Sequence, residues 1–263
     1  MSTNKKISII ISVLNAHKTL KACLESIINQ NFTDWELIII DGGSTDPTLE
    51  IIKDYSEFLS YWISEKDTGI YNAWNKALKK SNGEWICFIG SDDMLLPNSL
   101  ENLYKLANIN DVNFICSRVM MVNESGINVG AIGKRWNYYN FKNGLGIVHC
   151  GALHHKSLFY ENYFDETYKI AGDFEFLLRV GKFIKPAFLN EITVEMCNSG
   201  VSRRSINKVI LETSLAIYSS NEFNKIYGLR YFISAHLRNI IRRVIFLFPF
   251  GNELFIFKNS YTR

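Results

Sequence analysis

"ISIIISVL" (Ile7–Leu14) and "WELIIID" (Trp35–Asp41) are two near-continuous apolar runs that are rich in isoleucine. Runs of this kind are typical of strands covered by helices on both faces of a parallel sheet. Between them, apolar side chains recur at helical spacing, at Leu20, Cys23, Leu24, Ile27 and Ile28. The stretch from 7 to 41 therefore predicts a strand–helix–strand unit.

The same alternation continues to about residue 95. We expect Asp46 to cap a second helix that has Pro47 at its first position and continues to about Phe58. Three further elements follow, a strand in "YWISE" (61–65), a helix in "GIYNAWNKALKKS" (69–81) and a strand in "EWICFIG" (84–90). Because parallel strands need crossover connections that are usually helical, the sequence predicts an α/β protein with a Rossmann-like, mostly parallel sheet flanked by helices.

Polar side chains follow each of these four strands, at the edge of an open α/β sheet where ligands usually bind. They are Asn15, Asp41, Glu65, Asp67, Asp92 and Asp93. A single Asp at a strand end is more often a cap or turn residue, but four strand ends in succession favour a ligand site. Carboxylates repel a bare phosphate, so this edge calls for a divalent cation that bridges them to a diphosphate, or for a hydroxyl-rich ligand. The adjacent pair Asp92 and Asp93 is the predicted metal site.

The composition fits a folded chain with a basic C-terminal quarter. The protein has 263 residues, 47% of them hydrophobic, and a formal net charge of +3. This length permits one or two domains with a sizeable core. Residues 1–199 carry 19 Lys and Arg against 23 Asp and Glu, whereas residues 200–263 carry 10 against 3. The small overall charge does not by itself indicate a nucleic-acid-binding protein.

Cysteine usage and hydropathy indicate a cytoplasmic protein. The five cysteines are scattered and contain no CxxC pair, so neither a zinc ribbon nor a disulfide framework is predicted. Lys5 and Lys6 before an apolar run resemble the start of a signal peptide, but the run is short and no clear cleavage site follows. No uncharged run approaches the about 20 residues that a membrane-spanning helix needs.

Two stretches together resemble a known family. They run from Ile7 to Thr48, ending in "DGGSTDPT", and from Ser64 to Pro97, ending in "WICFIGSDDMLLP". They closely resemble the inverting family 2 glycosyltransferases, which have the GT-A fold, and the similarity extends from about Ile7 to Ser202. The resemblance implies a glycosyltransferase domain at 1–202, with a donor half at about 1–97 and an acceptor half at about 98–202. A helical extension would follow at 203–263.

The resemblance also implies which residues bind the donor. In the family, the residues after the first strand and the Asp that ends the second hold the base and ribose of a sugar nucleotide. These positions are Val13, Asn15 and Asp41 here, and Asp67 belongs to the same wall.

The family's DxD-type metal motif falls on Ser91-Asp92-Asp93. This match implies that Asp93 binds Mn²⁺ or Mg²⁺ on the diphosphate and that Asp92 lies near the ribose or the donor sugar. Ser91 replaces the first acid of a strict DxD. The chemistry agrees, because a divalent ion stabilises the charge on a leaving nucleoside diphosphate without a proton transfer.

The acceptor side is expected in the second half, where "INVGAIGKRWNYYNFKNGLGIVHCGALHHKSLF" (127–159) reads as short strands and loops. "YFDETYKIAGDFEFLLRVG" (163–181) resembles the family's segment in which an Asp at a helix start is the catalytic base, which implies Asp173. The family often has Glu before this Asp, where this chain has Gly172. Glu175 is the alternative base, but two residues along a helix it is rotated by roughly 200°, so only one of the two faces the cleft.

Two further segments of the acceptor half have weaker assignments. His149 stands where related sequences often have a histidine near the acceptor, although a single histidine is more often structural. "NSGVS" (198–202) looks like the family's loop that helps to close over the donor, and an ordinary turn is the equal alternative.

The C-terminal segment changes character from Leu229 onward. "LRYFISAHLRNIIRRVIFLFPFGNELFIF" interleaves four arginines with Phe, Ile and Leu. A basic amphipathic helix of this kind is typical of binding to an anionic membrane surface, here the inner face of the cell membrane. The alternative is a helix packed on the core with solvated arginines. No aromatic platform for nucleic acid is present in the pattern.

The sequence therefore predicts an inverting, metal-dependent glycosyltransferase. The expected donor is a nucleotide sugar, in particular a UDP-sugar, and the expected acceptor is a saccharide or lipid-linked saccharide in cell-surface polysaccharide biosynthesis. A non-catalytic sugar-nucleotide-binding or scaffold subunit at the membrane is the alternative. A nicotinamide oxidoreductase on the same α/β layout is disfavoured, because no GxGxxG fingerprint is present.

Overall fold

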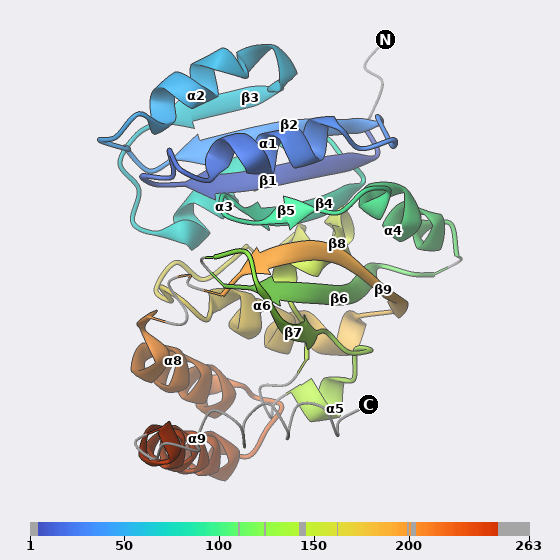
Figure 1. The fold of residues 1–263 in the computed structure, drawn as a ribbon. Helices are drawn as coiled ribbons and strands as arrows, with labels where there is room; N and C mark the ends of the chain where they lie inside the picture. The colour runs from blue at the N-terminus through green and yellow to red at the C-terminus, as the bar shows by residue number, and fades with distance from the viewer. Residues whose placement is uncertain are drawn as a thin grey trace.

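A single mixed sheet forms the centre of the protein in the computed structural model, which describes residues 5–109, 111–123, 125–141, 146–161, 163–198, 200 and 204–246 (Figure 1). Its strands are β1 (Ile7–Val13), β2 (Trp35–Asp41), β3 (Tyr61–Ser64), β4 (Trp85–Gly90), β5 (Met94–Leu95), β6 (Phe114–Val122), β7 (Asn128–Ile132), β8 (Ala152–His155) and β9 (Pro186–Cys197). The strand order is β3-β2-β1-β4-β8-β6-β9-β5, with β7 paired to β6.

The first four strands in this order are parallel, as the apolar runs predict. β1 pairs in parallel with β2 and β4, and β2 pairs in parallel with β3. β8 then runs antiparallel to both β4 and β6, while β6 and β9 are parallel. The predicted α/β fold with a mostly parallel sheet is confirmed.

Helices connect and cover these strands. They are α1 (Leu20–Ile28), α2 (Thr48–Asp54), α3 (Ile70–Leu78), α4 (Ser99–Ala107), α5 (Tyr138–Phe141), α6 (Gly172–Val180), α8 (Ile206–Ser219) and α9 (Lys225–Phe246). The second predicted helix is shorter than expected, since a separate 3-10 turn (Ser56–Phe58) follows α2. The helix begins at Thr48, one residue after the predicted start at Pro47, so Pro47 is the N-cap residue in place of Asp46, whose Oδ1 accepts a hydrogen bond from Thr48 N at 3.0 Å.

The isoleucines of β1 divide between two cores, one on each face of the sheet. Ile7, Ile9 and Ile11 pack in the cluster that contains α1, whereas Ile10 packs in the cluster that contains α3 and α6. All four are fully buried. Burial of each such side chain contributes about 1.5–3 kcal/mol, which explains why an unbroken apolar run is required here.

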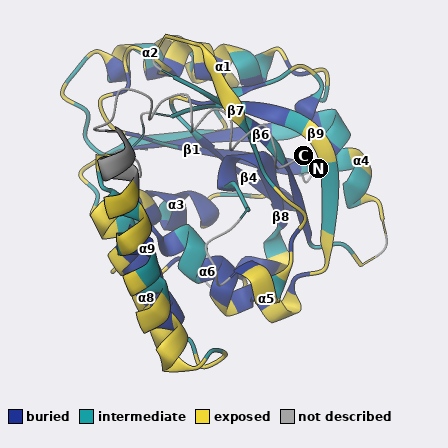
Figure 2. Cartoon of the chain, turned by 60° about the horizontal axis from the view of Figure 1, so that its bottom comes forward, coloured by how far each residue is buried: buried dark blue, intermediate teal, exposed yellow. Residues whose placement is uncertain are grey.

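The C-terminal helices α8 and α9 pack against each other at the end of the molecule opposite β3 (Figure 1). Figure 2 shows that exposed residues cover much of both helices, in contrast to the buried strands of the sheet. The helix predicted from Leu229 onward begins earlier, at Lys225. Residues 247–263, which include the proline-broken end of that segment, lie outside the described residues.

Candidate active site

The carboxyl ends of four neighbouring parallel strands share one edge of the sheet. Asp41 at the end of β2 is in register with Val13 at the end of β1 and with Ser64 at the end of β3. Gly90 ends β4 beside Ser12 of β1. The loops that carry the predicted polar residues therefore leave the sheet together.

The carboxylate of Asp41 organises the loop that follows β2. It is fully buried and accepts hydrogen bonds from the backbone N–H groups of Gly43 at 3.1 Å and Ser44 at 3.0 Å. The hydroxyl groups of Ser44 and Ser64 also donate to it, the latter at 2.6 Å. These donors satisfy the buried carboxyl oxygens and fix the conformation of residues 42–45, so Asp41 holds that loop through buried hydrogen bonds.

Val13 and Asn15 hold the same loop from the side of β1. The side chain of Val13 is buried, and its carbonyl accepts a hydrogen bond from Gly42 N at 2.9 Å. Asn15 has φ +52°, in the left-handed region that Asn tolerates better than most residues. Its Oδ1 accepts from Thr45 N at 2.8 Å, and its backbone N donates to Ser44 Oγ at 2.8 Å. The Asn15 side chain is exposed at the edge.

Asp67 lies against the loop from the side of β3. Its Oδ1 accepts a hydrogen bond from Gly69 N at 2.9 Å. A Cβ added to Gly42 would lie 2.8 Å from Asp67 Oδ2, so the absence of a side chain at Gly42 makes room for this carboxylate. Four predicted donor residues, Val13, Asn15, Asp41 and Asp67, thus surround the loop at 42–45.

Asp92 and Asp93 converge on the end of β4. A Cβ at Gly90 would lie 2.8 Å from Asp93 Oδ2 and 2.9 Å from Asp92 Oδ1, so both carboxylates approach its bare Cα. Asp93 Oδ2 also accepts a hydrogen bond from Gly90 N at 3.1 Å. Glycine at this position is therefore what lets the two charges sit side by side.

The two carboxylates differ in their surroundings. Asp93 is 6% exposed, whereas Asp92 is exposed. Burial and the charge of Asp92 raise the pKa of Asp93 to about 7, although the Gly90 N–H and the Cys150 thiol oppose this shift. Desolvation also raises the pKa of Asp92, and the positive charge of Arg204 opposes it. A buried carboxyl beside a second acid is costly to ionise unless a cation is present.

Asp92 and Asp93 provide part of the set of ligands that a metal ion needs. Among the described residues, no three His, Cys, Asp or Glu side chains gather closely enough to hold an ion. Mg²⁺ is commonly bound by one or two carboxylates together with phosphate oxygens and waters, and Mn²⁺ also prefers oxygen ligands. Asp92 and Asp93 fit this partial donor set, so they suit a cation that is shared with a diphosphate.

Asp173 lies in the first turn of α6, half-buried. Its Oδ1 accepts hydrogen bonds from the Tyr71 hydroxyl at 3.2 Å and from Phe174 N at 2.8 Å. Burial raises the pKa of Asp173, and these two hydrogen bonds oppose the shift. A carboxylate with a raised pKa is a stronger base than an exposed one, which suits it to accept a proton.

Close packing against Tyr71 explains why the residue before Asp173 is a glycine. A Cβ at Gly172 would lie 2.7 Å from Cε2 of Tyr71. The Tyr71 ring is 3% exposed and stacks on Phe164 with 5.6 Å between ring centroids. A larger residue at 172 would displace the tyrosine that donates to Asp173. Gly172 is therefore part of the arrangement that orients this carboxylate.

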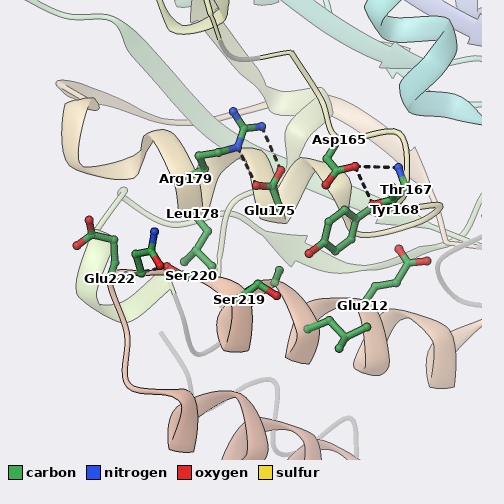
Figure 3. Close-up of a pocket in the computed structure, with 13 residues that line it drawn as sticks. Asp165, Thr167, Tyr168, Glu175, Leu178, Arg179, Glu212, Ser219, Ser220 and Glu222 are labelled. Atoms are coloured by element: carbon green, nitrogen blue, oxygen red, sulfur yellow. Dashed lines mark hydrogen bonds and ion pairs between the residues drawn. The ribbon is translucent and has the colours of Figure 1, made fainter.

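Glu175 has a different environment from Asp173, as the helix rotation predicts. It forms two hydrogen bonds with Arg179, at 2.8 Å and 3.1 Å. Glu175 also lines a pocket of about 670 Å³ between α6 and α8, which Figure 3 shows. Because Arg179 engages both carboxylate oxygens of Glu175, whereas Asp173 accepts from Tyr71, the geometry favours Asp173 as the base.

His149 lies in an aromatic cluster of the core. It is 8% exposed, and its ring stacks on Trp74 at 5.0 Å between centroids. The ring of His154 is 4.4 Å away. Neither nitrogen of His149 has a hydrogen-bond partner among the described residues, and burial lowers its pKa well below the usual value. The acceptor role of His149 stays a prediction.

Sequence reasoning missed the residues that tie the segment before α6 to its surroundings. Glu166 accepts hydrogen bonds from Asn72 at 2.8 Å and Asn75 at 2.9 Å, both on α3. Lys169 Nζ donates to the carbonyl of Thr68 at 2.9 Å. These contacts join residues about a hundred positions apart, and no local pattern indicates them. Of the predicted closing loop, Ser199, Val201 and Ser202 lie outside the described residues.

Comparison with known proteins identifies the family. The model of glycosyl transferase family 2 matches residues 8–167, which is more than half of the chain. The chain belongs to glycosyltransferase family 2. The match covers the donor-side loop and the Asp92–Asp93 pair, and it ends six residues before Asp173.

Individual relatives of this family 2 chain are more distant. It is 27% identical over 232 residues to the glycosyltransferase GlyA of Streptococcus pneumoniae, which covers 83% of the chain and 30% of that protein. The chain thus spans about a third of the length of this relative.

Two solved structures support the fold. S. aureus TarS 1–349 in complex with UDP has a TM-score of 0.66 at 20% identity, over 94% of this chain and 73% of that one. A mannosyltransferase, PcManGT from Pyrobaculum calidifontis, in complex with GDP-Man and Mn²⁺, has a TM-score of 0.64 at 12% identity, over 100% and 89%. The GT-A fold expected from the sequence is confirmed.

Proposed function

We propose that this family 2 chain is an inverting glycosyltransferase that moves a sugar from a nucleotide-sugar donor to an acceptor hydroxyl. The main support for the proposal comes from contacts at the start of α3, which join the predicted donor-binding residue Asp67 to the predicted base Asp173. Gly69, whose N–H is held by Asp67, directly precedes this helix, and Tyr71 in its first turn donates to Asp173. A donor held at Asp67 would thus lie beside the carboxylate of Asp173.

The donor residues divide into two groups. Asn15, Asp41 and Asp67, with Val13, shape and line the loop at 42–45, which supports a role in holding the nucleoside. Asp93, with Asp92 on its solvent side, is suited to a Mn²⁺ or Mg²⁺ ion on the diphosphate. When bound, that ion supplies positive charge that stabilises the leaving diphosphate.

Asp173 acts in the transfer as the general base. As the acceptor oxygen forms its bond to the anomeric carbon, the bond from that carbon to the diphosphate oxygen breaks, and the nucleoside diphosphate leaves with the electron pair. The proton of the acceptor hydroxyl passes to Asp173. Tyr71 orients the carboxylate through its hydrogen bond. One displacement inverts the anomeric configuration.

We infer a UDP-sugar as the donor and a saccharide or lipid-linked saccharide as the acceptor, in cell-surface polysaccharide biosynthesis. A structural neighbour in complex with UDP supports the nucleotide, although another holds GDP-Man. A neighbour with Mn²⁺ supports the cation. The acceptor assignment rests on the family alone.

We also infer a peripheral position on the anionic inner face of the cell membrane. In the part of the chain that the structure describes, no helix is both long and apolar enough to span a bilayer. The outer face of α9 carries exposed aliphatic residues at helical spacing, Leu229, Ile233, Leu237 and Ile240, each more than half exposed. Arg230 and Arg238 are exposed on the same helix. This pattern supports docking on anionic lipid.

Asp173→Asn tests the reaction. Release of nucleoside diphosphate from a panel of nucleotide sugars with MnCl₂ should fall by about 10²–10⁴ in the variant, because general-base assistance is typically worth that factor. Binding of the donor with Mn²⁺, measured by thermal shift, should persist. Glu175→Gln is the matched control, since it removes the alternative carboxylate of the same helix, and it should retain most of the activity.

The two variants separate the alternatives. If Glu175→Gln abolishes turnover and Asp173→Asn does not, the base is assigned to the wrong residue. A wild-type protein that binds a nucleotide sugar but never turns it over would favour the non-catalytic binding subunit.

A further inference from the structure

Glu212 is a buried carboxylate on α8 that the proposed reaction does not use. It is 8% exposed. The other buried residues of α8 are uncharged, namely Ile210, Thr213, Ser214, Ala216 and Ile217. Burial of a carboxylate is costly unless hydrogen bonds compensate it, so the partners of Glu212 indicate its role.

Those partners are three consecutive backbone N–H groups. Lys169 N donates to Oε1 at 3.1 Å and to Oε2 at 3.0 Å. Ile170 N and Ala171 N donate to Oε2 at 2.8 Å and 2.9 Å. Successive N–H groups that converge on one anion form a nest, which is strongest when the acceptor is charged.

The nest lies immediately before α6. Ala171 is the N-cap residue of that helix, and no side-chain hydrogen bond of its own caps the helix. A carboxylate at a helix N-terminus also interacts favourably with the helix dipole. Glu212 therefore holds, from a helix 41 residues further along the chain, the backbone that leads into α6.

The segment held by Glu212 reaches both sides of the proposed site. Lys169 Nζ bridges from it to the carbonyl of Thr68, next to Asp67, at 2.9 Å. Asp173 follows Ala171 by two residues, in the first turn of the helix. A shift of residues 169–171 would thus move Asp173 and, at the same time, the contact of Lys169 with the backbone next to Asp67.

We propose that Glu212 is a positioning residue for the transfer reaction, which holds residues 169–171 so that Asp173 and Lys169 keep their places at the site. This inference rests on the proposed function, because it takes Asp173 as the base. Glu212 also acts through its charge, which contributes to the raised pKa of Asp173 after the larger effect of burial. The effect of Glu212 on the position of residues 169–171 is measured by transfer, and the effect of its charge is measured by the pKa of Asp173.

Glu212→Gln tests both links in the full chain. The amide keeps one oxygen acceptor but loses the charge and replaces the second oxygen with a donor group that faces N–H groups. Transfer should fall by about 10- to 100-fold, since a displacement of about 1 Å at a catalytic group has that order of effect. The pKa of Asp173, measured by NMR of ¹³C-labelled Asp carboxyls, should move down, with Asp173→Asn used to assign the signal. Binding of UDP with MnCl₂ should change by much less than transfer does.

Two further variants control the result. Glu222→Gln removes a carboxylate in the turn between α8 and α9, which pairs with Lys182 and not with the nest, and it should change neither transfer nor the Asp173 titration. Glu212→Asp keeps the charge but shortens the side chain. It should lower transfer while leaving the pKa of Asp173 close to its wild-type value, and it replaces Glu212→Gln if that variant does not fold.

Wild-type transfer and an unchanged Asp173 titration in Glu212→Gln would overturn the inference. So would a loss of UDP binding as large as the loss of transfer, because that result indicates general damage to the fold. If Asp173→Asn itself keeps full transfer, the proposed role of Asp173 as the base has failed, and the NMR titration still reports whether Glu212 and Asp173 interact.

Discussion

At the scale of single residues, the Asp92–Asp93 pair shows how a glycine leaves room for two adjacent carboxylates. Both carboxylates lie against Gly90, and only Asp93 is buried. Adjacent acids would be an unfavourable end for a buried strand if they served the fold alone. A cation bound by Asp93 during function would offset this cost, which the following prediction tests.

Asp93→Ala should abolish the Mn²⁺-dependent part of donor binding. The variant removes the buried oxygen ligands and leaves the polar edge of the sheet intact, so the protein should stay folded. Thermal shift with UDP, with and without MnCl₂, measures the effect. A ligand at 100 times its Kd stabilises the folded state by about 2.7 kcal/mol, which is easily detected in the wild type.

Asp92→Ala is the matched control for this prediction. It removes the exposed acid of the pair, so donor binding should weaken while most of the response to Mn²⁺ remains. Equal Mn²⁺ responses in the wild type and in Asp93→Ala would show that Asp93 is not a metal ligand.

At the scale of elements, the strands that are buried on both faces could be predicted closely. β1, β2 and β4 lie within one residue of the predicted bounds, because burial on two sides requires unbroken apolar runs, and the half-buried edge strand β3 does so as well. β6 and β9 were not predicted. β9 is mostly half-exposed and contains the exposed residues Asn190 and Glu191, which interrupt the apolar pattern.

The residues of the candidate site also differ in whether they could be predicted from the sequence. Residues that follow a strand or start a helix, such as Asp41 and Asp173, can be found from the sequence because their position in the element places them. Tyr71 and Glu212 could not, since their contacts join segments that are 102 and 41 residues apart. One signal was available for Glu212, as a charged residue on the apolar face of a helix is unusual.

The exposed aliphatic face of α9 gives the prediction at this scale. Ile233→Glu combined with Leu237→Glu should weaken binding to vesicles of phosphatidylcholine and phosphatidylglycerol by at least about tenfold, because each buried aliphatic side chain contributes about 1.5–3 kcal/mol. Wild-type binding should decrease with added salt, since the arginines contribute electrostatically. Vesicle sedimentation measures both effects.

The control introduces the same type of change elsewhere. Ile127→Glu replaces an isoleucine that is 61% exposed, close to the 58% of Ile233, but lies before β7 and remote in sequence from α9. It should bind vesicles like the wild type. If the α9 variant aggregates or unfolds while Ile127→Glu does not, α9 packs on another surface and the membrane assignment is wrong.

At the scale of the whole molecule, buried ionisable groups link stability to pH with opposite signs. Asp173 has a raised pKa in the folded state, so the folded protein binds more protons there, and this contribution to stability decreases as the pH rises. His149 and His154 have the reverse effect. Burial lowers both of their pKa values, that of His154 to about 3. The unfolded state therefore binds more protons at the histidines, and their contribution to stability increases with pH.

The histidine pair gives the last prediction, a loss of stability below pH 6.5. Each imidazole that stays neutral in the folded state reduces the free energy of unfolding by about 1.4 kcal/mol per pH unit below its unfolded pKa, or about 2 kcal/mol between pH 6.5 and 5. His154→Gln should therefore flatten the slope of unfolding free energy against pH by about one proton in urea titrations. Because the comparison is of slopes, a lower absolute stability of the variant does not affect it, and the carboxylates contribute equally to the variant and the wild type. An unaltered slope in His154→Gln would mean that this imidazole takes up its proton within the folded core, which its complete burial among Phe88, Phe114 and His149 argues against.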